Sequence, residues 1–218
     1  MMITRGDFAR SPSEGYTPVI NHLQQRDARL ATVIAETTLP PLPEPATPYL
    51  SLLRAVVNQQ IARSTAQRIW QRLLNQLGSD LAPDQLLLQA EQLQSSGLSR
   101  QKVCYLQSIA LYAQQHDLSA AALEALSDQQ MIQQLTGIHG IGEWTVQMLL
   151  IFCLHRPDVL PLEDLIIRRA MQRLYSPEAS QGSLLRRELQ QIATQWEPYR
   201  SSACRYLWSW HSQLTLTN

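Results

Sequence analysis

Apolar residues recur at three-to-four-residue spacing from Tyr49 almost to the C-terminus, and this period constrains the fold more than any other feature. Such a period places one apolar face along each helix. No segment shows the sustained apolar–polar alternation of a half-buried strand, and β-branched residues are scattered. The sequence therefore predicts an all-α fold with short connections between the helices.

Helix boundaries follow from capping and helix-breaking residues. Gly78 is the expected C-cap of a helical region that starts at Tyr49, and Ser127 with Gln130 resembles a capping box. The remaining pattern predicts helices over residues 16–36, 84–95, 100–115, 127–136, 143–154, 163–175, 183–195 and 199–212.

The N-terminal part differs in character from the rest. Residues 1–15 resemble a loose tail, and prolines cluster between residues 40 and 48 in an extended connector. The helix over 16–36 carries apolar residues that need a partner surface, so we expect it to pack on the C-terminal helices. The expected organisation is an N-terminal segment, 1–48, that packs on the core, followed by a domain of two helical lobes over 49–218.

Three cysteines bear on the question of a metal centre. Cys104, Cys153 and Cys204 are widely spaced, and no Cys-x-x-Cys or Cys/His ligand spacing occurs. We therefore expect neither a zinc site nor a four-cysteine iron–sulfur cluster. The cysteines are better explained as small apolar residues of the interior.

Composition limits the location and the partners. The longest apolar run, Met148 to Leu154, is far shorter than the ~20 residues of a membrane span. No secretory signal pattern opens the chain. We expect no membrane partner, and a location in the bacterial cytosol or nucleoid, or in the nucleus of a eukaryotic cell. Because 18 basic residues balance 18 acidic ones, any nucleic-acid contact depends on the local distribution of charge.

A glycine-rich turn between two expected helices carries the main functional signal. Gly137, Gly140 and Gly142 lie in the stretch from Thr136 to Gly142, directly before the expected helix over 143–154. Glycines allow a sharp turn and a close backbone approach. The N–H groups at the start of the following helix form an anion site suited to a DNA phosphate. An ordinary helix-to-helix connection is the alternative, although one glycine usually suffices for it.

This stretch resembles the helix-hairpin-helix element of the HhH-GPD DNA glycosylases, and the sequence is similar to the 3-methyladenine DNA glycosylase II type. The resemblance runs in order from about residue 49 to residue 210 and implies a two-lobed helical fold with the active-site cleft between the lobes. The matching segments are Val57-Asn58-Gln59-Gln60-Ile61, Gly97-Leu98-Ser99 with Lys102 and Tyr105, Gly140 to Thr145, Val159-Leu160-Pro161 with Asp164, Arg168-Arg169-Ala170, and Trp196 to Ser201 with Trp208.

Asp164 is the expected catalytic residue. The resemblance implies a catalytic aspartate about twenty residues past the hairpin, and Asp164 lies 20 positions after Trp144. Cleavage of a purine N-glycosidic bond builds positive charge on the sugar, which an ionised carboxylate stabilises. A plain helix N-cap is the alternative, and both roles can hold at once. The neighbouring Glu163 is expected to face solvent.

The resemblance also distinguishes monofunctional from bifunctional enzymes. Bifunctional members such as endonuclease III carry a lysine just after the hairpin glycine and cleave the strand through a Schiff base. Trp144 occupies that position here, and Lys102, the only lysine, is distant from it in sequence. We therefore expect base removal that leaves an abasic site.

Aromatic side chains are expected to bind the flipped base, because cationic alkylated purines are attracted to aromatic faces. The resemblance places Trp208 at the base pocket, with Met148 and Leu165 where well-known relatives carry tyrosines, and Trp144 is the second candidate. Packing in the core is the alternative for Trp208 and Trp210.

The resemblance gives two further roles, and arginine side chains offer a third, for which solvated surface is the alternative. Gln60, with Gln59 beside it, is placed where a side chain fills the gap left by a flipped base; exposed glutamines at a helix end are the alternative. Backbone carbonyls of Thr136, Ile138 and Ile141 are placed where relatives hold a monovalent cation, Na⁺ or K⁺. Arginines that could add phosphate contacts are Arg63, Arg100, Arg168 and Arg169.

Together these features predict a monomeric enzyme with no required cofactor that acts on double-stranded DNA. It is expected to hydrolyse the glycosidic bond of alkylated bases, chiefly 3-methyladenine, with 7-methylguanine and 1-methyladenine as further candidates. A non-catalytic helix-hairpin-helix DNA-binding module is the alternative. The residues expected to bind DNA through the hairpin are Gly137, Ile138, His139, Gly140, Ile141, Gly142 and Thr145.

Overall fold

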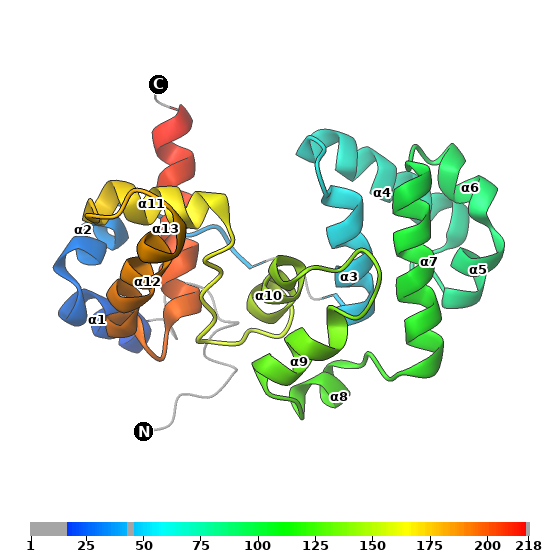
Figure 1. Cartoon of the computed structure of the whole chain (residues 1–218). Coiled ribbons are helices and arrows are strands. Elements are labelled where there is room, and N and C mark those ends of the chain that lie inside the picture. Colours follow the sequence, from blue (N-terminus) through cyan, green and yellow to red (C-terminus); the bar gives the residue numbers. More distant parts are fainter. Residues whose placement is uncertain (1–16, 43–45, 217–218) are drawn as a thin grey trace. The chain divides into compact units, whose positions relative to one another are not determined.

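The computed structural model describes residues 17–42 and 46–216, and every regular element in these residues is helical. The predicted all-α class is confirmed. The expected tail over residues 1–15 lies outside the described residues. The chain divides into two compact units: unit 1 comprises Met1–Pro43 with His155–Asn218, and unit 2 comprises Glu44–Leu154 (Figure 1). No helix in the described ranges is long and apolar enough to cross a membrane.

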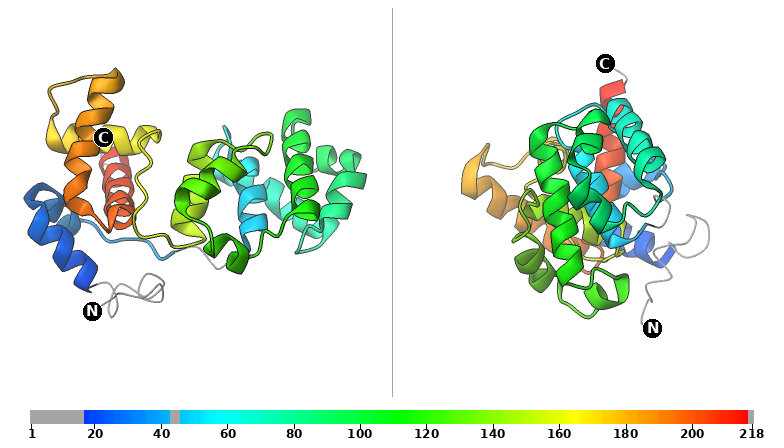
Figure 2. Two further views of the ribbon diagram at one scale, coloured as in Figure 1. Left: turned by 60° about the horizontal axis from the view of Figure 1, so that its bottom comes forward. Right: turned by 90° about the vertical axis from the view of Figure 1, so that its right-hand side faces the viewer.

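Unit 1 joins the two ends of the chain around one apolar core. Its core includes Leu30 and Val33 from the N-terminal part and Met171, Leu189 and Leu207 from the C-terminal part. Helix α13 lies beside α11 and also contacts α2 (Figure 2). The helices of unit 1 are α1 (Thr17–Arg26), α2 (Ala28–Glu36), α11 (Leu165–Tyr175), α12 (Gly182–Ala193), the 3₁₀ helix η2 (Thr194–Trp196) and α13 (Arg200–Leu216).

Asp27 divides the expected helix over 16–36 into α1 and α2. Its backbone is extended, and its Oδ1 accepts hydrogen bonds from the backbone N–H groups of Arg29 and Leu30 at the start of α2. Its Oδ2 accepts from the hydroxyl of Tyr175 at 2.6 Å and from the indole N–H of Trp196 at 2.8 Å. These donors lie far away in sequence, so the local period alone could not reveal the break.

Unit 2 is built around α7, which packs against α5 and α3, while α10 packs against α3 and α9 (Figure 1). Its buried residues include Leu52, Val56, Leu106, Ile109 and Leu150. The helices of unit 2 are α3 (Pro48–Asn58), α4 (Arg63–Leu77), α5 (Pro83–Leu88), α6 (Ala90–Ser95), α7 (Arg100–Gln115), α8 (Ala120–Glu124), α9 (Asp128–Leu135) and α10 (Glu143–Phe152).

Two expected helix ends of unit 2 are confirmed. Gly78 caps α4 with a φ of 88°, and Ser127 forms the capping box of α9 with Gln130. The prediction of a continuous helix is wrong in two places in this unit. The helical region from residue 49 to residue 77 is interrupted between α3 and α4, and the helix over 84–95 is interrupted at Gln89, between α5 and α6. Short α8 was not expected, because five residues cannot show a clear helical period.

Candidate active site and DNA-binding hairpin

Asp164 is buried, with 9% of its surface exposed, and is the N-cap residue of α11 in unit 1. Its Oδ1 accepts a hydrogen bond from the backbone N–H of Ile167 at 2.9 Å. The same oxygen accepts a second one from the indole Nε1 of Trp208 at 3.1 Å. The carboxylate therefore caps its helix and is also held by an aromatic side chain from α13.

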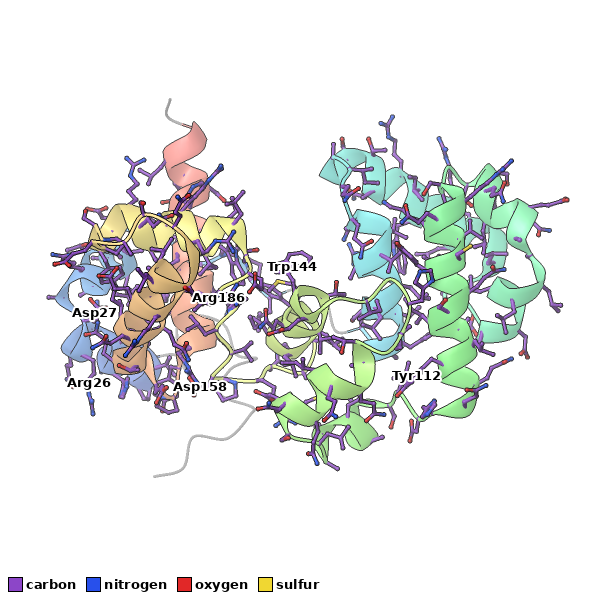
Figure 3. All side chains as sticks on the ribbon, in the orientation of Figure 1. Arg26, Asp27, Tyr112, Trp144, Asp158 and Arg186 are labelled. Carbon is purple, nitrogen blue, oxygen red and sulfur yellow. The ribbon has the colours of Figure 1, made fainter. Side chains whose placement is uncertain are left out.

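The loop before Asp164 is fastened to the start of α13. Arg200 donates from Nε to Asp158 Oδ1 at 2.7 Å and from Nη2 to Asp158 Oδ2 at 2.8 Å, a two-point ion pair (Figure 3 labels Asp158). Ser201 Oγ donates to the carbonyl of Arg156 and accepts from the N–H of Val159. A bidentate pair fixes direction as well as distance, so this end of the loop has a defined path.

The other end of the loop is held by Arg168. Its Nη1 donates to the carbonyls of Leu162 at 2.9 Å and Glu163 at 3.0 Å. The Glu163 side chain is exposed, as expected, and forms ion pairs with Arg186 of α12 (Figure 3) and, at 3.9 Å, with Arg168. Arg168, which was considered for phosphate contact, is thus engaged in holding the loop that presents Asp164.

Cys204 of α13, one helical turn before Trp208, is fully buried. Burial raises the pKa of its thiol, and the negative charge of Asp164 raises that pKa further. The thiol therefore stays protonated and uncharged near neutral pH, and it adds no second negative charge to the region of Asp164.

Trp208 and Trp210 point in different directions, as two positions on a helix must when they are two residues apart. Trp208 reaches Asp164. The guanidinium group of Arg173 instead lies over the ring of Trp210, 6.0 Å from the ring centre. Leu165, directly after Asp164, is 48% exposed. The structure therefore places the expected pocket residues Trp208 and Leu165 beside the candidate catalytic carboxylate.

The hairpin lies in unit 2 between α9 and α10. Ile138 and Ile141 are buried, and the N–H of Ile141 donates to the carbonyl of Ile138 at 3.0 Å. The turn is therefore anchored by its two isoleucines. His139 between them is exposed, and its ring meets the ring of Tyr105 edge to face at 4.9 Å.

The three hairpin glycines differ in backbone conformation and in the atoms around them. Gly140 has a φ of +93°, and a Cβ built there would lie 2.2 Å from Cγ of Tyr105. Gly137 has one tight contact, 3.3 Å to the carbonyl oxygen of Gln134, and Gly142 has no atom within 4 Å. Only Gly140 among these three needs glycine for both its backbone conformation and its surroundings. Tyr105, which creates the second requirement, could be found only by seeing the packing of α7.

The start of α10 has the properties of an anion site. Gly142 is its N-cap and offers no side-chain hydrogen bond, and the N–H groups of the first turn of a helix point away from the helix toward its start. The side chain of Glu143 accepts from Gln147 one turn further along α10. Trp144 is 40% exposed on the first turn (Figure 3), whereas Thr145 is buried. Met148, the other expected pocket residue in this unit, is half-buried and one helical turn after Trp144.

The two glutamines after α3 are not equivalent. The side-chain Nε2 of Gln59 donates to the carbonyl of Gly140 at 3.2 Å, so Gln59 is committed to the hairpin. Gln60 is exposed and has a φ of 55°, a conformation that residues other than glycine rarely adopt. Gln60 is therefore the better candidate for insertion into DNA.

Lys102 was set aside on sequence distance, yet it lies close to this loop. Its Nζ donates to the carbonyl of Val57 at 2.8 Å and to the carbonyl of Gln59 at 2.7 Å. Partial burial lowers the pKa of this ammonium group. The sequence marked Lys102 only as part of a segment that matches the family, and gave no signal for a contact with residues more than 40 positions away.

The family model for HhH-GPD superfamily base excision DNA repair proteins matches residues 53–195. This range contains Gln59, Gln60, the hairpin and Asp164. The chain belongs to the HhH-GPD superfamily. The matched range thus contains both the hairpin between α9 and α10 and the buried, helix-capping Asp164.

Relatives of this HhH-GPD protein cover most of its length. It is 36% identical to DNA-3-methyladenine glycosylase 1 of Schizosaccharomyces pombe over 166 residues, which is 74% of this chain and 71% of that protein. The crystal structure of a DNA-3-methyladenine glycosidase from Bacillus halodurans has a TM-score of 0.78, with 30% identity and 91% of each chain covered. A 3-methyladenine DNA glycosylase of S. pombe, in complex with abasic DNA, has a TM-score of 0.73, with 30% identity, covering 88% of this chain and 95% of that one.

Proposed function

We propose that this HhH-GPD protein is a monofunctional DNA glycosylase that removes alkylated bases from DNA in base excision repair. The observation that carries the proposal is Asp164, a buried carboxylate held by two N–H donors on one oxygen. It occurs in a chain that is similar to DNA-3-methyladenine glycosylases over most of its length. In a DNA-binding module without catalysis, Asp164 would serve as the N-cap of α11, a role that does not require the second hydrogen bond from Trp208.

The chemistry required of Asp164 is electrostatic. As the C–N bond breaks, its electron pair leaves with the base, and the sugar becomes positively charged. A fixed negative charge in a site with little water stabilises that developing charge far more than the neutral ground state. Water then attacks the sugar carbon and loses a proton, which leaves an abasic site. The Arg200–Asp158 pair, Ser201 and Arg168 hold the loop, so Asp164 needs little reorganisation during the reaction.

A lyase step has no suitable nucleophile at the hairpin. Trp144 occupies the position of the lysine in bifunctional members of the superfamily. The one lysine, Lys102, directs its Nζ to two backbone carbonyls at the end of α3. An amine engaged in this way is poorly placed to attack a sugar, which supports hydrolysis without strand cleavage.

The substrates that suit this site are alkylated purines. We propose 3-methyladenine as the chief substrate, with 7-methylguanine and 1-methyladenine as further candidates. Such bases are electron-poor or cationic and are attracted to aromatic faces. Trp208 lies at hydrogen-bonding distance from Asp164, so a base stacked on it would bring its sugar close to the carboxylate.

The hairpin supplies the binding of the DNA backbone. We propose that the first N–H groups of α10 bind a phosphate of double-stranded DNA and that the enzyme acts as a monomer without a required cofactor. Backbone carbonyls are ligands that fit a monovalent cation, and Thr136, Ile138 and Ile141 would hold Na⁺ or K⁺ there. Such an ion would add positive charge next to the phosphate. The enzyme would act where DNA is, in a bacterial nucleoid or a nucleus.

The decisive experiment compares the wild-type protein with Asp164→Asn on methylated duplex DNA, with released bases measured by chromatography. We expect 3-methyladenine release by the wild type and none above background by the variant. The amide keeps an oxygen that can accept from Ile167 and Trp208, so binding to an abasic-site duplex should remain within about threefold, because hairpin amides supply most of the binding. Substantial base release by folded Asp164→Asn would remove Asp164 from its role.

A further inference from the structure

The loop after α3 is held from two sides within unit 2. On one side, Lys102 of α7 donates to the carbonyls of Val57 and Gln59. The last carbonyls of a helix lack hydrogen-bond donors within the helix and carry partial negative charge. An ammonium group supplies both the missing hydrogen bonds and a compensating positive charge. On the other side, the Gln59 side chain donates to the carbonyl of Gly140 in the hairpin.

These two contacts share one residue. Gln59 receives the Lys102 hydrogen bond on its backbone carbonyl and gives its own side-chain hydrogen bond to the hairpin. Gln60, the next residue, takes a left-handed backbone conformation and is exposed. A residue with a positive φ stays in that conformation only when its surroundings impose it. The hydrogen bonds made by the side chain, the carbonyl and the N–H of Gln59 hold the chain directly before Gln60.

We propose that Lys102 is a positioning residue that fixes the loop over residues 59–62 against the hairpin, so that Gln60 is presented to the gap left by a flipped base. The proposal rests on the proposed glycosylase function. In this proposal, Gln59 links the hairpin that binds the phosphate to the loop that fills the gap in the base stack. Lys102 touches neither DNA nor the reacting atoms and acts through the loop alone.

The rival explanation is that Lys102 only stabilises the end of α3. The two explanations differ in how Lys102 and Gln60 depend on each other. If Lys102 acts by placing Gln60, then its removal has little effect once the Gln60 side chain is gone. If Lys102 only supports the fold, the two losses are independent and add.

The experiment is a double-mutant cycle with Lys102→Met and Gln60→Ala. Insertion is read from the fluorescence of 2-aminopurine placed opposite an abasic-site analogue in a duplex, and excision from single-turnover release of 3-methyladenine. Each single variant should lose about tenfold in single-turnover rate and most of the fluorescence change, because small misplacements of such groups are costly. The double variant should lose no more than about twofold beyond Gln60→Ala. Arg68→Met, which removes an exposed positive charge from α4 in the same unit, is the matched control and should behave as wild type.

Two results would overturn the proposal: additive losses in the double variant, or an unchanged 2-aminopurine signal in folded Lys102→Met. Should Lys102→Met not fold, Gln59→Leu carries the test, because it removes the link to Gly140 and keeps the carbonyl that accepts from Lys102. A Gln59→Leu protein with normal insertion would also contradict the proposal. The fluorescence arm uses DNA without an excisable base, so failure of the wild type to release 3-methyladenine would count against the glycosylase function and leave the positioning role measurable.

Discussion

Gly140 lies in the hairpin where α7 comes closest, and its replacement by alanine is the sharpest test of the hairpin structure. The added Cβ would lie 2.2 Å, 2.5 Å and 2.7 Å from three ring atoms of Tyr105. Carbon atoms prefer separations of about 3.5–4.0 Å. The ring or the hairpin must therefore move by more than an ångström, and Tyr105 is itself held by His139 and Gln101.

The expected cost has two parts. Inserting a methyl group into a packed contact costs about 1–3 kcal/mol. Placing alanine at a φ of +93° costs roughly 1–2 kcal/mol more. We therefore expect Gly140→Ala to lower the free energy of unfolding by about 2–5 kcal/mol. Gly142→Ala is the matched control: its φ of −97° suits any residue and no atom lies within 4 Å, so only the replacement of a glycine N-cap by alanine remains, at a cost of up to about 1 kcal/mol.

The assay is urea-induced unfolding followed by circular dichroism, for both alanine variants and for Tyr105→Ala in each background. Because Tyr105→Ala removes the clashing ring, Gly140→Ala should cost about 1–3 kcal/mol less in that background, leaving only the backbone part. Equal stabilities of Gly140→Ala and Gly142→Ala would refute the reasoning. So would a Gly140→Ala cost that does not depend on Tyr105.

Three further predictions concern the reaction and the binding of DNA. Borohydride should trap no covalent complex with DNA, and base release should not be coupled to strand cleavage, because Trp144 replaces the amine of lyases and Lys102 donates to backbone carbonyls. A trapped adduct on gel electrophoresis would contradict the monofunctional assignment. The slope of log DNA affinity against log salt concentration, at roughly −0.9 per neutralised phosphate, should correspond to only a few phosphates, because the net charge is zero. A steep slope in fluorescence anisotropy titrations would reveal a basic face not recognised in the sequence. Trp208→Leu should lower 3-methyladenine excision by roughly 2- to 30-fold more than it lowers binding to an abasic-site mimic, which has no base to stack. A larger defect for Trp210→Leu, whose ring lies by Arg173, would show that the wrong tryptophan had been assigned to the base.

Several features of the protein were accessible from the sequence because they depend on neighbouring residues. The helical class follows from the apolar period, and the cap at Gly78 and the capping box of α9 follow from residues three or four positions apart. Asp164 could be singled out as a helix N-cap on the same grounds. Its role in catalysis needed more, since the resemblance to a family selected it from other capping residues.

Tertiary structure decided the features that join distant residues. The break at Asp27 depends on Tyr175 and Trp196, which are more than a hundred positions away. The resemblance had selected Trp208 over Trp210, but the hydrogen bond from Trp208 to Asp164, 44 residues earlier in the chain, is visible only in the folded structure.

The hairpin combines features that depend on neighbouring residues with features that depend on distant ones. Its three glycines mark a turn in the sequence, but only the ring of Tyr105 makes Gly140 differ from Gly142. Sequence distance excluded Lys102 only as the nucleophile, and the packing of α7 against α3 brings it to the end of α3. Capping and periodicity act over one or two turns of backbone, so a linear sequence displays them directly. Contacts between helices depend on which faces the core brings together, and that arrangement exists only in the folded chain.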